Sequence, residues 1–367
     1  MRPSYRPEPP ESKRHSIAMA SAFSDLAIAP GTPPMEAKLA SEIPFGDGWQ
    51  FEPKWDGFRC LAFRDGDAIE LMSKSGKPLA RYFPEVAEAI RALAKNRLVL
   101  DGELVLPVGD ALSFGALQLR LHPAASRIEK LSRETPAQLM LFDALQLGGD
   151  VLVQRPLAER RTCLEQFMRR AAGPRLHLSP ATRDPRVALE WFACSGNALD
   201  GIVVKRVDAA YEPGERAMIK VKQQRTADCV VGGYRKGKSG VGSLLLGLFD
   251  HVGKLDYVGF TSSFSDEDRT ALATKLAKDK GLSPFTGSSP GGVSRWSRGR
   301  DSAEWVPLKG DLVAEVAYDQ VTGGRFRHGT TFLRWREDKR PDQCTKDQLE
   351  HELSPEALEQ VLEKAAT

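Results

Sequence analysis

The chain has 367 residues, which favours about two domains at roughly 150 residues each. Its composition, 41% hydrophobic and 28% charged, is ordinary for a globular protein. A chain of this length buries roughly three quarters of its unfolded surface, so it needs no disulfide or metal to hold a core. The 52 basic and 49 acidic residues leave a net charge of +3, which neither identifies nor excludes a nucleic-acid-binding protein, because local patches matter more than the sum.

Cysteine and histidine usage predicts a reduced protein without structural zinc. The five cysteines are odd in number and form no CxxC pair, and the six histidines show no metal-ligand spacing. No apolar run approaches the ~20 residues of a membrane span, and the N-terminus lacks the apolar core of a secretory signal. We therefore expect a monomeric cytoplasmic protein that does not enter a membrane.

The first two thirds of the chain predict a disordered tail and an α+β domain. Residues 1–24 are rich in proline, arginine and serine, which is typical of disorder. Between residues 25 and 225, apolar periodicity alternates between strand and helix spacing without a repeated βαβ unit. The predicted strands are residues 60–65, 68–74, 98–106 (as a hairpin-like pair), 138–147, 199–206 and 217–222, and the predicted helices are residues 81–95 and 156–171.

The pattern changes near residue 225. Residues 226–350 contain short strands separated by glycines and one helix, which is typical of a small Greek-key barrel such as an OB-fold. The strands are predicted at residues 227–234, 242–250, 255–261 and 311–320, and the helix at residues 265–279 with Ser265 as its N-cap. An amphipathic helix is predicted in residues 351–367.

The stretch FEPKWDGFR, residues 51–59, raises the question of whether Lys54 reacts. An ordinary lysine has a pKa of about 10.4, so a lysine nucleophile needs cationic neighbours, a metal or burial to lose its proton. By itself, KxDG is a weak signal, because Asp-Gly is a common turn and lysine a common surface residue. Other charged residues interrupt apolar runs at 101–103 and 200–205, and Lys220 and Lys222 share one side of a predicted strand.

As an ordered set, these segments resemble the covalent nucleotidyltransferases, and among them the ATP-dependent DNA ligases. The resemblance covers about residues 33–346. The matching motifs are KWDGFR (54–59), SKSGK (73–77), LVLDGELV (98–105), LMLFDAL (139–145), DGIVVK (200–205), MIKVK (218–222) and RWREDKRP (334–341), which is similar to the family's RxDK motif. The chain is most similar to the short bacterial C-type ligases.

The resemblance implies an adenylation domain of antiparallel sheets and helices at residues 25–225, followed by an OB-fold domain. It also implies three chemical steps. Lys54 attacks the α-phosphate of ATP, giving lysyl-AMP and pyrophosphate. The AMP then moves to the 5′-phosphate of a nick in duplex DNA, and the 3′-hydroxyl displaces it. Positioning and charge neutralisation do most of the catalysis in such reactions.

Residue roles carry over from the motifs by position. The implied catalytic residues are Lys54, Asp56, Arg334, Asp338 and Lys339, the last three orienting pyrophosphate. The implied nucleotide-binding residues are Glu52 (adenine), Phe142 (stacking), Glu103 (ribose), Arg59, Lys74, Arg216, Lys220 and Lys222. Glu103 and Asp200 are the implied ligands of Mg²⁺ or Mn²⁺. Lys74 stands where the family usually has Arg, and Asp200 where it usually has Glu.

DNA contacts are expected from loops and the barrel face, because the short segment before Lys54 leaves no room for the helical DNA-binding domain of larger ligases. The expected DNA-binding residues are Arg120, Arg127, Lys236, Lys238, Arg325 and Arg327, whose side chains can bind phosphates without reading sequence. From the family, we expect a nucleoid-associated repair enzyme that acts beside a gap-filling polymerase.

Three alternatives remain open from the sequence. The nearest is an RNA ligase or a GTP-using mRNA capping enzyme, which shares the lysine motif. The second is a non-catalytic OB-type binding module with a degenerate nucleotide pocket. The third is a ligase domain detached from a larger end-joining fusion. Preference for nicks or double-strand ends, the metal ion and the repair pathway also remain open.

Overall fold

The computed structural model describes residues 22–108, 111–171, 173–193, 199–223, 225–238, 240–290 and 304–349. The chain forms two compact units, with the boundary between Lys222 and Gln223, three residues before the predicted one. The predicted C-terminal helix and residues 1–21 of the predicted tail lie outside the described residues. The predicted tail was too long at its end, because Phe23 is buried and packs edge-on against Phe63.

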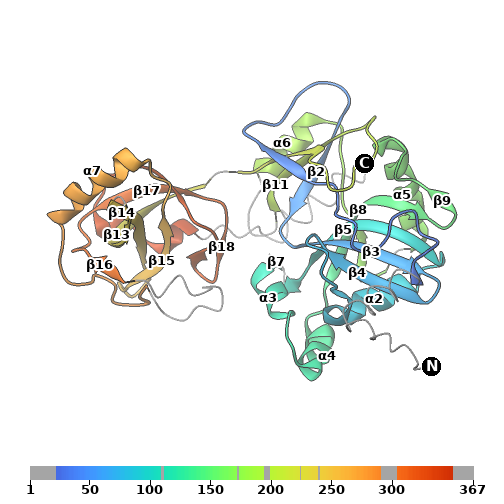
Figure 1. Ribbon diagram of the computed structural model, residues 1–367, viewed down its shortest axis with the longest axis horizontal. Coiled ribbons are helices and arrows are strands. Elements are labelled where there is room, and N and C mark those ends of the chain that lie inside the picture. Colours follow the sequence, from blue (N-terminus) through green and yellow to red (C-terminus); the bar gives the residue numbers. More distant parts are fainter. Residues whose placement is uncertain are drawn as a thin grey trace, which may run out of the picture. The chain divides into compact units, whose positions relative to one another are not determined.

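The first unit is built on two mainly antiparallel sheets (Figure 1). The four-stranded sheet has the order β1 (Ala37–Ala40), β12 (Met218–Val221), β11 (Leu199–Arg206) and β2 (Trp49–Trp55). The six-stranded sheet has the order β10 (Leu176–Leu178), β8 (Gln138–Leu147), β5 (Arg97–Val105), β3 (Phe58–Asp65) and β4 (Ala68–Ser73), with β9 (Asp150–Val151) paired to β8. A short hairpin joins β6 (Pro107–Val108) to β7 (Ala111–Leu112).

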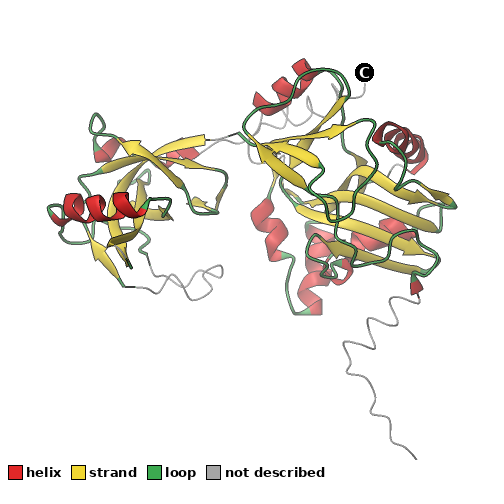
Figure 2. Cartoon of the chain, turned by 45° about the horizontal axis from the view of Figure 1, so that its top comes forward, coloured by secondary structure: helices red, strands yellow, loops and turns green. Residues whose placement is uncertain are grey.

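Helices cover the sheets of this unit (Figure 2). They are η1 (Ala80–Tyr82), α2 (Pro84–Arg91), α3 (Phe114–Leu119), α4 (Ala125–Glu134), α5 (Leu157–Ala171) and α6 (Pro185–Ala193). Alternation along β3 serves both faces of its sheet: Cys60 and Ala62 join the core beneath α2 and α5, while Leu61 and Phe63 face the core that contains Phe23. The six-stranded sheet is therefore buried on both sides.

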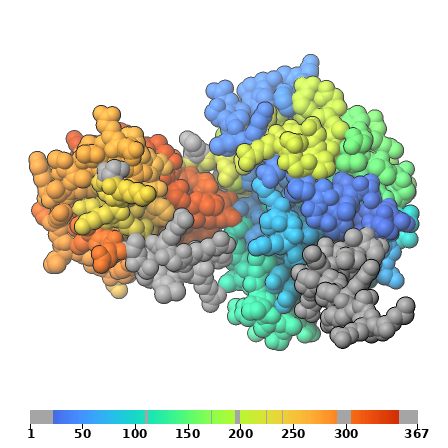
Figure 3. Space-filling view, in the orientation of Figure 1, coloured from blue at the N-terminus to red at the C-terminus, as the bar shows by residue number. Residues whose placement is uncertain are grey.

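The four-stranded sheet joins distant parts of the chain. Strand β1 pairs in parallel with β12, and β2 pairs antiparallel with β11, so residues near 40 and 50 lie beside residues near 200 and 220 (Figure 3). Helix α6 packs on this sheet through Ala188 and Trp191. The sheet therefore brings the segment containing Lys54 next to those containing Asp200 and Lys222.

Most predicted elements are confirmed, and one is wrong. Strand β8 has the predicted bounds, and α5 begins directly after Pro156. Residues 98–106 are not a hairpin but belong to the single strand β5, which pairs with β3 on one side and β8 on the other. Pairing on both sides holds Asp101-Gly102 in mid-strand and overrides its turn preference.

The described residues of the second unit form a small barrel. Its main sheet has the order β15 (Leu255–Thr261), β14 (Gly240–Phe249), β13 (Arg225–Gly237), β17 (Val313–Tyr318) and β20 (Thr331–Trp335), and β16 (Trp305–Pro307) pairs with β13. The hydroxyl of Thr261 donates to the Thr330 carbonyl at 2.8 Å, and Thr330 N–H donates to the Phe260 carbonyl at 3.1 Å. These contacts join the two outer strands and close the sheet, which gives the OB-type barrel.

Helix α7 (Asp266–Ala277) covers the barrel through Leu272 and Leu276. Ser265 caps it as predicted, in a capping box with Asp268. The remaining elements of the unit are the hairpin β18 (Val321–Thr322) and β19 (Arg325–Phe326) and the turns η2 (Pro341–Gln343) and η3 (Lys346–Leu349). The α+β fold, a domain of antiparallel sheets and helices followed by an OB-type barrel, is thus as expected.

A buried ion pair ties α5 to β8 in the first unit. Arg160 donates through Nε and Nη2 to the two oxygens of Asp143 at 2.8 and 3.0 Å, and both side chains are 1% exposed. We predict that Arg160→Met lowers the free energy of unfolding by about 3–5 kcal/mol, because it leaves a buried carboxylate without its partner. Urea unfolding measured by fluorescence checks this.

The matched control is Arg133→Ala, which removes an exposed helical pair with Glu129. This change should leave the free energy of unfolding nearly unchanged, because solvent screens such pairs. If both variants unfold at the wild-type urea concentration, Arg160 does not stabilise the first unit.

Candidate active site

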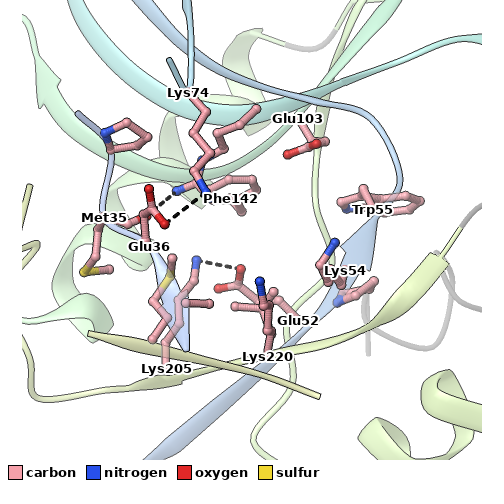
Figure 4. Close-up of a pocket in the computed structure, with 16 residues that line it drawn as sticks. Met35, Glu36, Glu52, Lys54, Trp55, Lys74, Glu103, Phe142, Lys205 and Lys220 are labelled. Atoms are coloured by element: carbon pink, nitrogen blue, oxygen red, sulfur yellow. Dashed lines mark hydrogen bonds and ion pairs between the residues drawn. The ribbon is translucent and has the colours of Figure 1, made fainter. Parts of the chain in front are cut away.

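A pocket of about 200 Å³ opens between the two sheets of the first unit (Figure 4). Its walls come from the segment before β1, from the ends of β2 and β12, and from β5, β8 and β11. The lining residues are Pro34, Met35, Glu36, Ala37, Glu52, Pro53, Lys54, Trp55, Arg59, Lys74, Glu103, Phe142, Val203, Lys205, Met218 and Lys220. Seven of the predicted site residues therefore lie around one cavity: Glu52, Lys54, Arg59, Lys74, Glu103, Phe142 and Lys220.

Lys54 and Lys222 share one carboxylate at this site. Lys54 Nζ lies 2.7 Å from Asp200 Oδ2, and Lys222 Nζ lies 2.9 Å from the same oxygen. The side chain of Asp200 is 5% exposed, whereas each lysine is about a quarter exposed, and Lys54 also lines the pocket. The indole of Trp55 donates to the Ser179 hydroxyl at 2.9 Å and anchors the strand end that carries Lys54.

Two glycines allow the strands to approach this closely. A Cβ added to Gly57 would lie 2.1 Å from the Leu104 carbonyl oxygen. Gly201 has a φ of +126°, and a Cβ there would lie 2.0 Å from the Val221 oxygen. The glycines of KWDG and DGIVVK are therefore required by backbone packing beside Lys54 and Asp200.

Glu52 lies in a buried polar cluster on the pocket wall. Its Oε1 accepts from Gln50 Nε2 at 2.7 Å, and its Oε2 lies 2.6 Å from Lys205 Nζ. All three side chains are buried. Lys205 Nζ also lies 4.5 Å from the ring centre of Phe142, which faces the pocket. The apolar ring and the fixed carboxylate give the pocket one stacking surface and one acceptor.

Arg59 is held by Asp101. Its Nε and Nη2 each lie 2.6 Å from an Asp101 oxygen, and Tyr211 donates to the same carboxylate at 2.7 Å. Burial lowers the pKa of Arg59, but the charge and hydrogen bonds of Asp101, with smaller effects of Tyr211 and Glu103, together outweigh burial, so the net pKa is raised and the guanidinium stays charged. Its carbon Cζ lies 4.6 Å from the ring centre of Phe142, so a fixed cation faces the pocket beside this ring.

Glu103 has a perturbed carboxyl group. Burial raises the pKa of Glu103 to about 7, against the opposing effect of the cations Lys54 and Arg59. Asp56 and Asp101 add to the increase. Near neutral pH the group is therefore close to half-ionised, and a cation bound beside it would favour the charged form.

The rest of the pocket is strongly cationic. Burial lowers the pKa of Lys220, and the neighbouring charges of Lys54, Lys222 and Lys74 lower it further. Lys74 pairs with Glu36 at 2.9 Å, and the mostly exposed Arg216 lies 3.9 Å from the same carboxylate. Such a group of cations is suited to binding a chain of phosphates.

The RxDK segment belongs to the second unit. Arg334 pairs with Glu315 at 2.6 Å, Lys339 pairs with Asp228 at 2.7 Å, and Asp338 pairs with Arg336. The hydrogen bond from Arg336 lowers the pKa of Asp338 to about 2. The residues Arg336, Glu337, Asp338 and Lys339 have the RxDK spacing, so the arginine of this motif is Arg336, two residues after the predicted Arg334.

One predicted DNA contact is wrong. Arg120 is completely buried, and its guanidinium binds Glu85 at 2.7 Å and the carbonyl oxygens of Tyr82 and Thr135. It joins α2 to the ends of α3 and α4, so it cannot reach a phosphate. The other expected residues keep accessible side chains: Arg127, Lys236 and Lys238 are exposed, and Arg325 and Arg327 are half-buried.

The sequence did not predict several residues of these networks, among them Gln50, Lys205, Glu36 and Arg336. Lys205 is the last residue of the motif DGIVVK, and Arg336 lies within the motif RWREDKRP. The sequence therefore contained a pattern that could have indicated both residues. Gln50 and Glu36 lie outside those motifs. Their roles follow only from contacts with Glu52 and with Lys74.

Within the described ranges, no three His, Cys, Asp or Glu side chains gather as a ready metal site. The cysteines at 60, 163, 229 and 344 are free thiols. In the same part of the chain, no helix is long and apolar enough to cross a membrane.

A lysine held against a carboxylate in a small cationic pocket, in a domain followed by an OB-type barrel, is the arrangement expected of the nucleotidyltransferases that the motifs resemble. Two family models match the chain: "ATP dependent DNA ligase domain" over residues 34–222 and "ATP dependent DNA ligase C terminal region" over residues 237–339. The chain belongs to the ATP-dependent DNA ligases.

Curated relatives agree over nearly their full lengths. DNA ligase C2 of Mycolicibacterium smegmatis is 46% identical over 344 residues, covering 89% of this chain and 96% of that protein. DNA ligase C of Mycobacterium tuberculosis is 42% identical over 348 residues, covering 90% and 96%. The solved structure named Pmar-Lig_PreS3 has a TM-score of 0.56 at 17% identity, covering 86% of this chain and 70% of that one, which shows the shared fold. The protein is thus a short bacterial ATP-dependent DNA ligase.

The raised pKa of Glu103 predicts a pH-dependent stability. The ordinary value is 4.5 and the folded value about 7. The stability that protonated Glu103 contributes is therefore complete below pH 4.5 and is lost as pH rises through about 7. Glu103→Gln cannot ionise, so its free energy of unfolding does not fall in this way. The difference in free energy of unfolding between the variant and wild type should therefore grow in favour of the variant as pH rises through this window. Above the window the difference should stay constant.

Urea unfolding of both proteins between pH 4.5 and 8.5 measures this difference. Gln118→Ala, which changes a side chain on α3 that does not ionise, is the control and should show no such widening. A gap between Glu103→Gln and wild type that is independent of pH would mean that Glu103 ionises normally.

Proposed function

We propose that this ligase seals nicks in duplex DNA through a covalent lysyl-AMP on Lys54. The contact between Lys54 Nζ and Asp200 Oδ2 carries the proposal, because it fixes one primary amine inside the cationic pocket. Attack on the α-phosphate of ATP would form a P–N bond and break the bond to pyrophosphate, while the amine loses a proton. Transfer to a 5′-phosphate would release the lysine, and the 3′-hydroxyl would then displace AMP.

The pocket offers a place for each part of ATP. Phe142 gives a ring on which adenine can stack, and Glu52, fixed by Gln50 and Lys205, gives an acceptor for the exocyclic amine of adenine. Glu103, which lines the pocket, would bind the ribose, and Lys74, Lys220, Lys222 and Arg216 would bind phosphates. A guanine presents a carbonyl oxygen instead of this amine, so the acceptor favours ATP over GTP.

Glu103 fits a divalent cation, because burial raises the pKa of its carboxyl and a bound metal would offset that burial by favouring the charged form. Asp200 is a poorer candidate for a metal ligand, because its Oδ2 already contacts the ammonium groups of Lys54 and Lys222. Mg²⁺ or Mn²⁺ bound here would neutralise phosphate charge. Arg59 stays fixed by Asp101 and supports the ribose side of the pocket.

In the second unit, Arg336, Asp338 and Lys339, which have the RxDK spacing, would orient pyrophosphate during the first step, together with the predicted Arg334. Lys236, Lys238, Arg325, Arg327 and Arg127 would bind DNA phosphates, replacing the incorrect assignment of Arg120. A repair role is supported by relatives that are named end-joining DNA repair proteins, such as LigD of Mycobacterium tuberculosis, 31% identical over 308 residues and matched over 37% of its length. A gap-filling polymerase is the partner expected of such a role in the bacterial nucleoid.

The lysyl-AMP step predicts that Lys54→Ala loses all labelling by α-labelled ATP in a denaturing gel, because the acceptor amine is gone. The wild type and Lys130→Ala, an exposed lysine on α4, should label equally. Incubation with metal and nucleotide alone is sufficient for this measurement.

A second substrate separates loss of chemistry from loss of fold. Lys54→Ala should still seal a nick that already carries AMP on its 5′-phosphate, because that step needs no lysine nucleophile. Labelling of Lys54→Ala at the wild-type level would refute the assignment of Lys54.

DNA binding through exposed cations predicts a strong salt dependence. Affinity for nicked DNA should fall steeply between about 50 and 200 mM salt, and each of Lys236→Gln and Lys238→Gln should reduce the slope of log affinity against log salt by about 1. Lys254→Gln, on the turn after β14, is the control. An affinity that is flat across this range would contradict the assigned phosphate contacts.

A further inference from the structure

The cations of the RxDK segment converge on one buried carboxylate in the barrel. Asp228 lies on β13 and is 8% exposed. Its two oxygens accept from Arg336 Nη1 at 2.9 and 3.0 Å, and its Oδ2 also lies 2.7 Å from Lys339 Nζ. One acidic side chain, 108 residues before Arg336 and 111 before Lys339, therefore fixes both basic residues of RxDK relative to each other.

Asp228 is itself held rigidly. Its backbone N–H donates to Gln348 Oε1 at 2.9 Å, and its carbonyl accepts from Gln348 Nε2 at 3.1 Å. The side-chain amide of Gln348, on η3, thus binds both polar groups of the Asp228 backbone. A carboxylate anchored in this way can define where its partners lie, instead of following them.

The sheet register places a second acid beside Asp228. Asp228 pairs with Glu315 on β17, and Glu315 pairs with Arg334 on β20. Two carboxylates directly opposite each other on neighbouring strands repel, so the arrangement is unfavourable without cations between them. Arg336 lies 3.9 Å from Glu315 as well as bonding to Asp228, and so relieves this repulsion. The acid pair thereby draws the RxDK cations to one place.

We propose that Asp228 is a positioning residue for the adenylation step, which keeps Arg336 and Lys339 preorganised for the phosphates of ATP. This inference rests on the proposed role of RxDK in orienting pyrophosphate. Without the carboxylate, the two cations repel each other and the lysine gains conformational freedom, which must be lost again when phosphate binds.

The test compares two reactions of Asp228→Asn in the full-length chain. Formation of lysyl-AMP from ATP should slow by at least about tenfold, because a misplaced catalytic group costs that much or more. Sealing of a nick that already carries AMP should stay near the wild-type rate, because no pyrophosphate leaves in that step. Asp228→Glu, which keeps the charge, should recover part of the adenylation rate.

Asp256→Asn is the matched control, since it removes another ion-paired carboxylate of the barrel, the partner of Lys346, without touching RxDK. Its adenylation rate should match the wild type. Adenylation by Asp228→Asn at or above the wild-type rate would overturn the inference, and so would equal losses in both reactions, which indicate a purely structural role. Wild-type protein that forms no lysyl-AMP would instead refute the proposed function.

Discussion

The Asp200 carboxylate is the contact on which the site depends, because it joins lysines from two strands that meet only in the folded sheet. Lys54 ends β2, Asp200 begins β11 and Lys222 follows β12, and these three strands are neighbours in one sheet. The shared anion lets two ammonium groups lie close together despite their repulsion. Lys54 also lines the pocket, together with Lys74 and Lys220.

Buried ion pairs around the pocket extend this arrangement. Glu52 with Lys205 and Arg59 with Asp101 hold charged groups in fixed positions on opposite walls, at the cost of removing them from water. Such pairs are weak contributors to stability, and their value here is geometric. They present an acceptor and a cation to a ligand without any rearrangement, and a preorganised polar site of this kind favours phosphoryl transfer.

The sequence predicted those parts of the fold that depend on local pattern. Strand β8 and the Ser265 cap were predictable because periodicity and capping act over a few residues. The DGE segment was predicted wrongly, since pairing with β3 and β8 overrides a turn preference that is real in isolation. Arg120 was predicted wrongly because a sequence shows charge but not the partner, and its partner Glu85 lies 35 residues away.

The same limit applies to the site. Motif order indicated Lys54, Glu103 and Asp200, but the roles of Gln50, Glu36 and Asp228 lie in contacts between distant segments.

The most direct test of the central claim is peptide mass spectrometry of the wild-type enzyme after incubation with ATP and Mg²⁺. The account predicts one acid-labile AMP group, on Lys54. An AMP group on Lys220 or Lys222, with Lys54 unmodified, would contradict it.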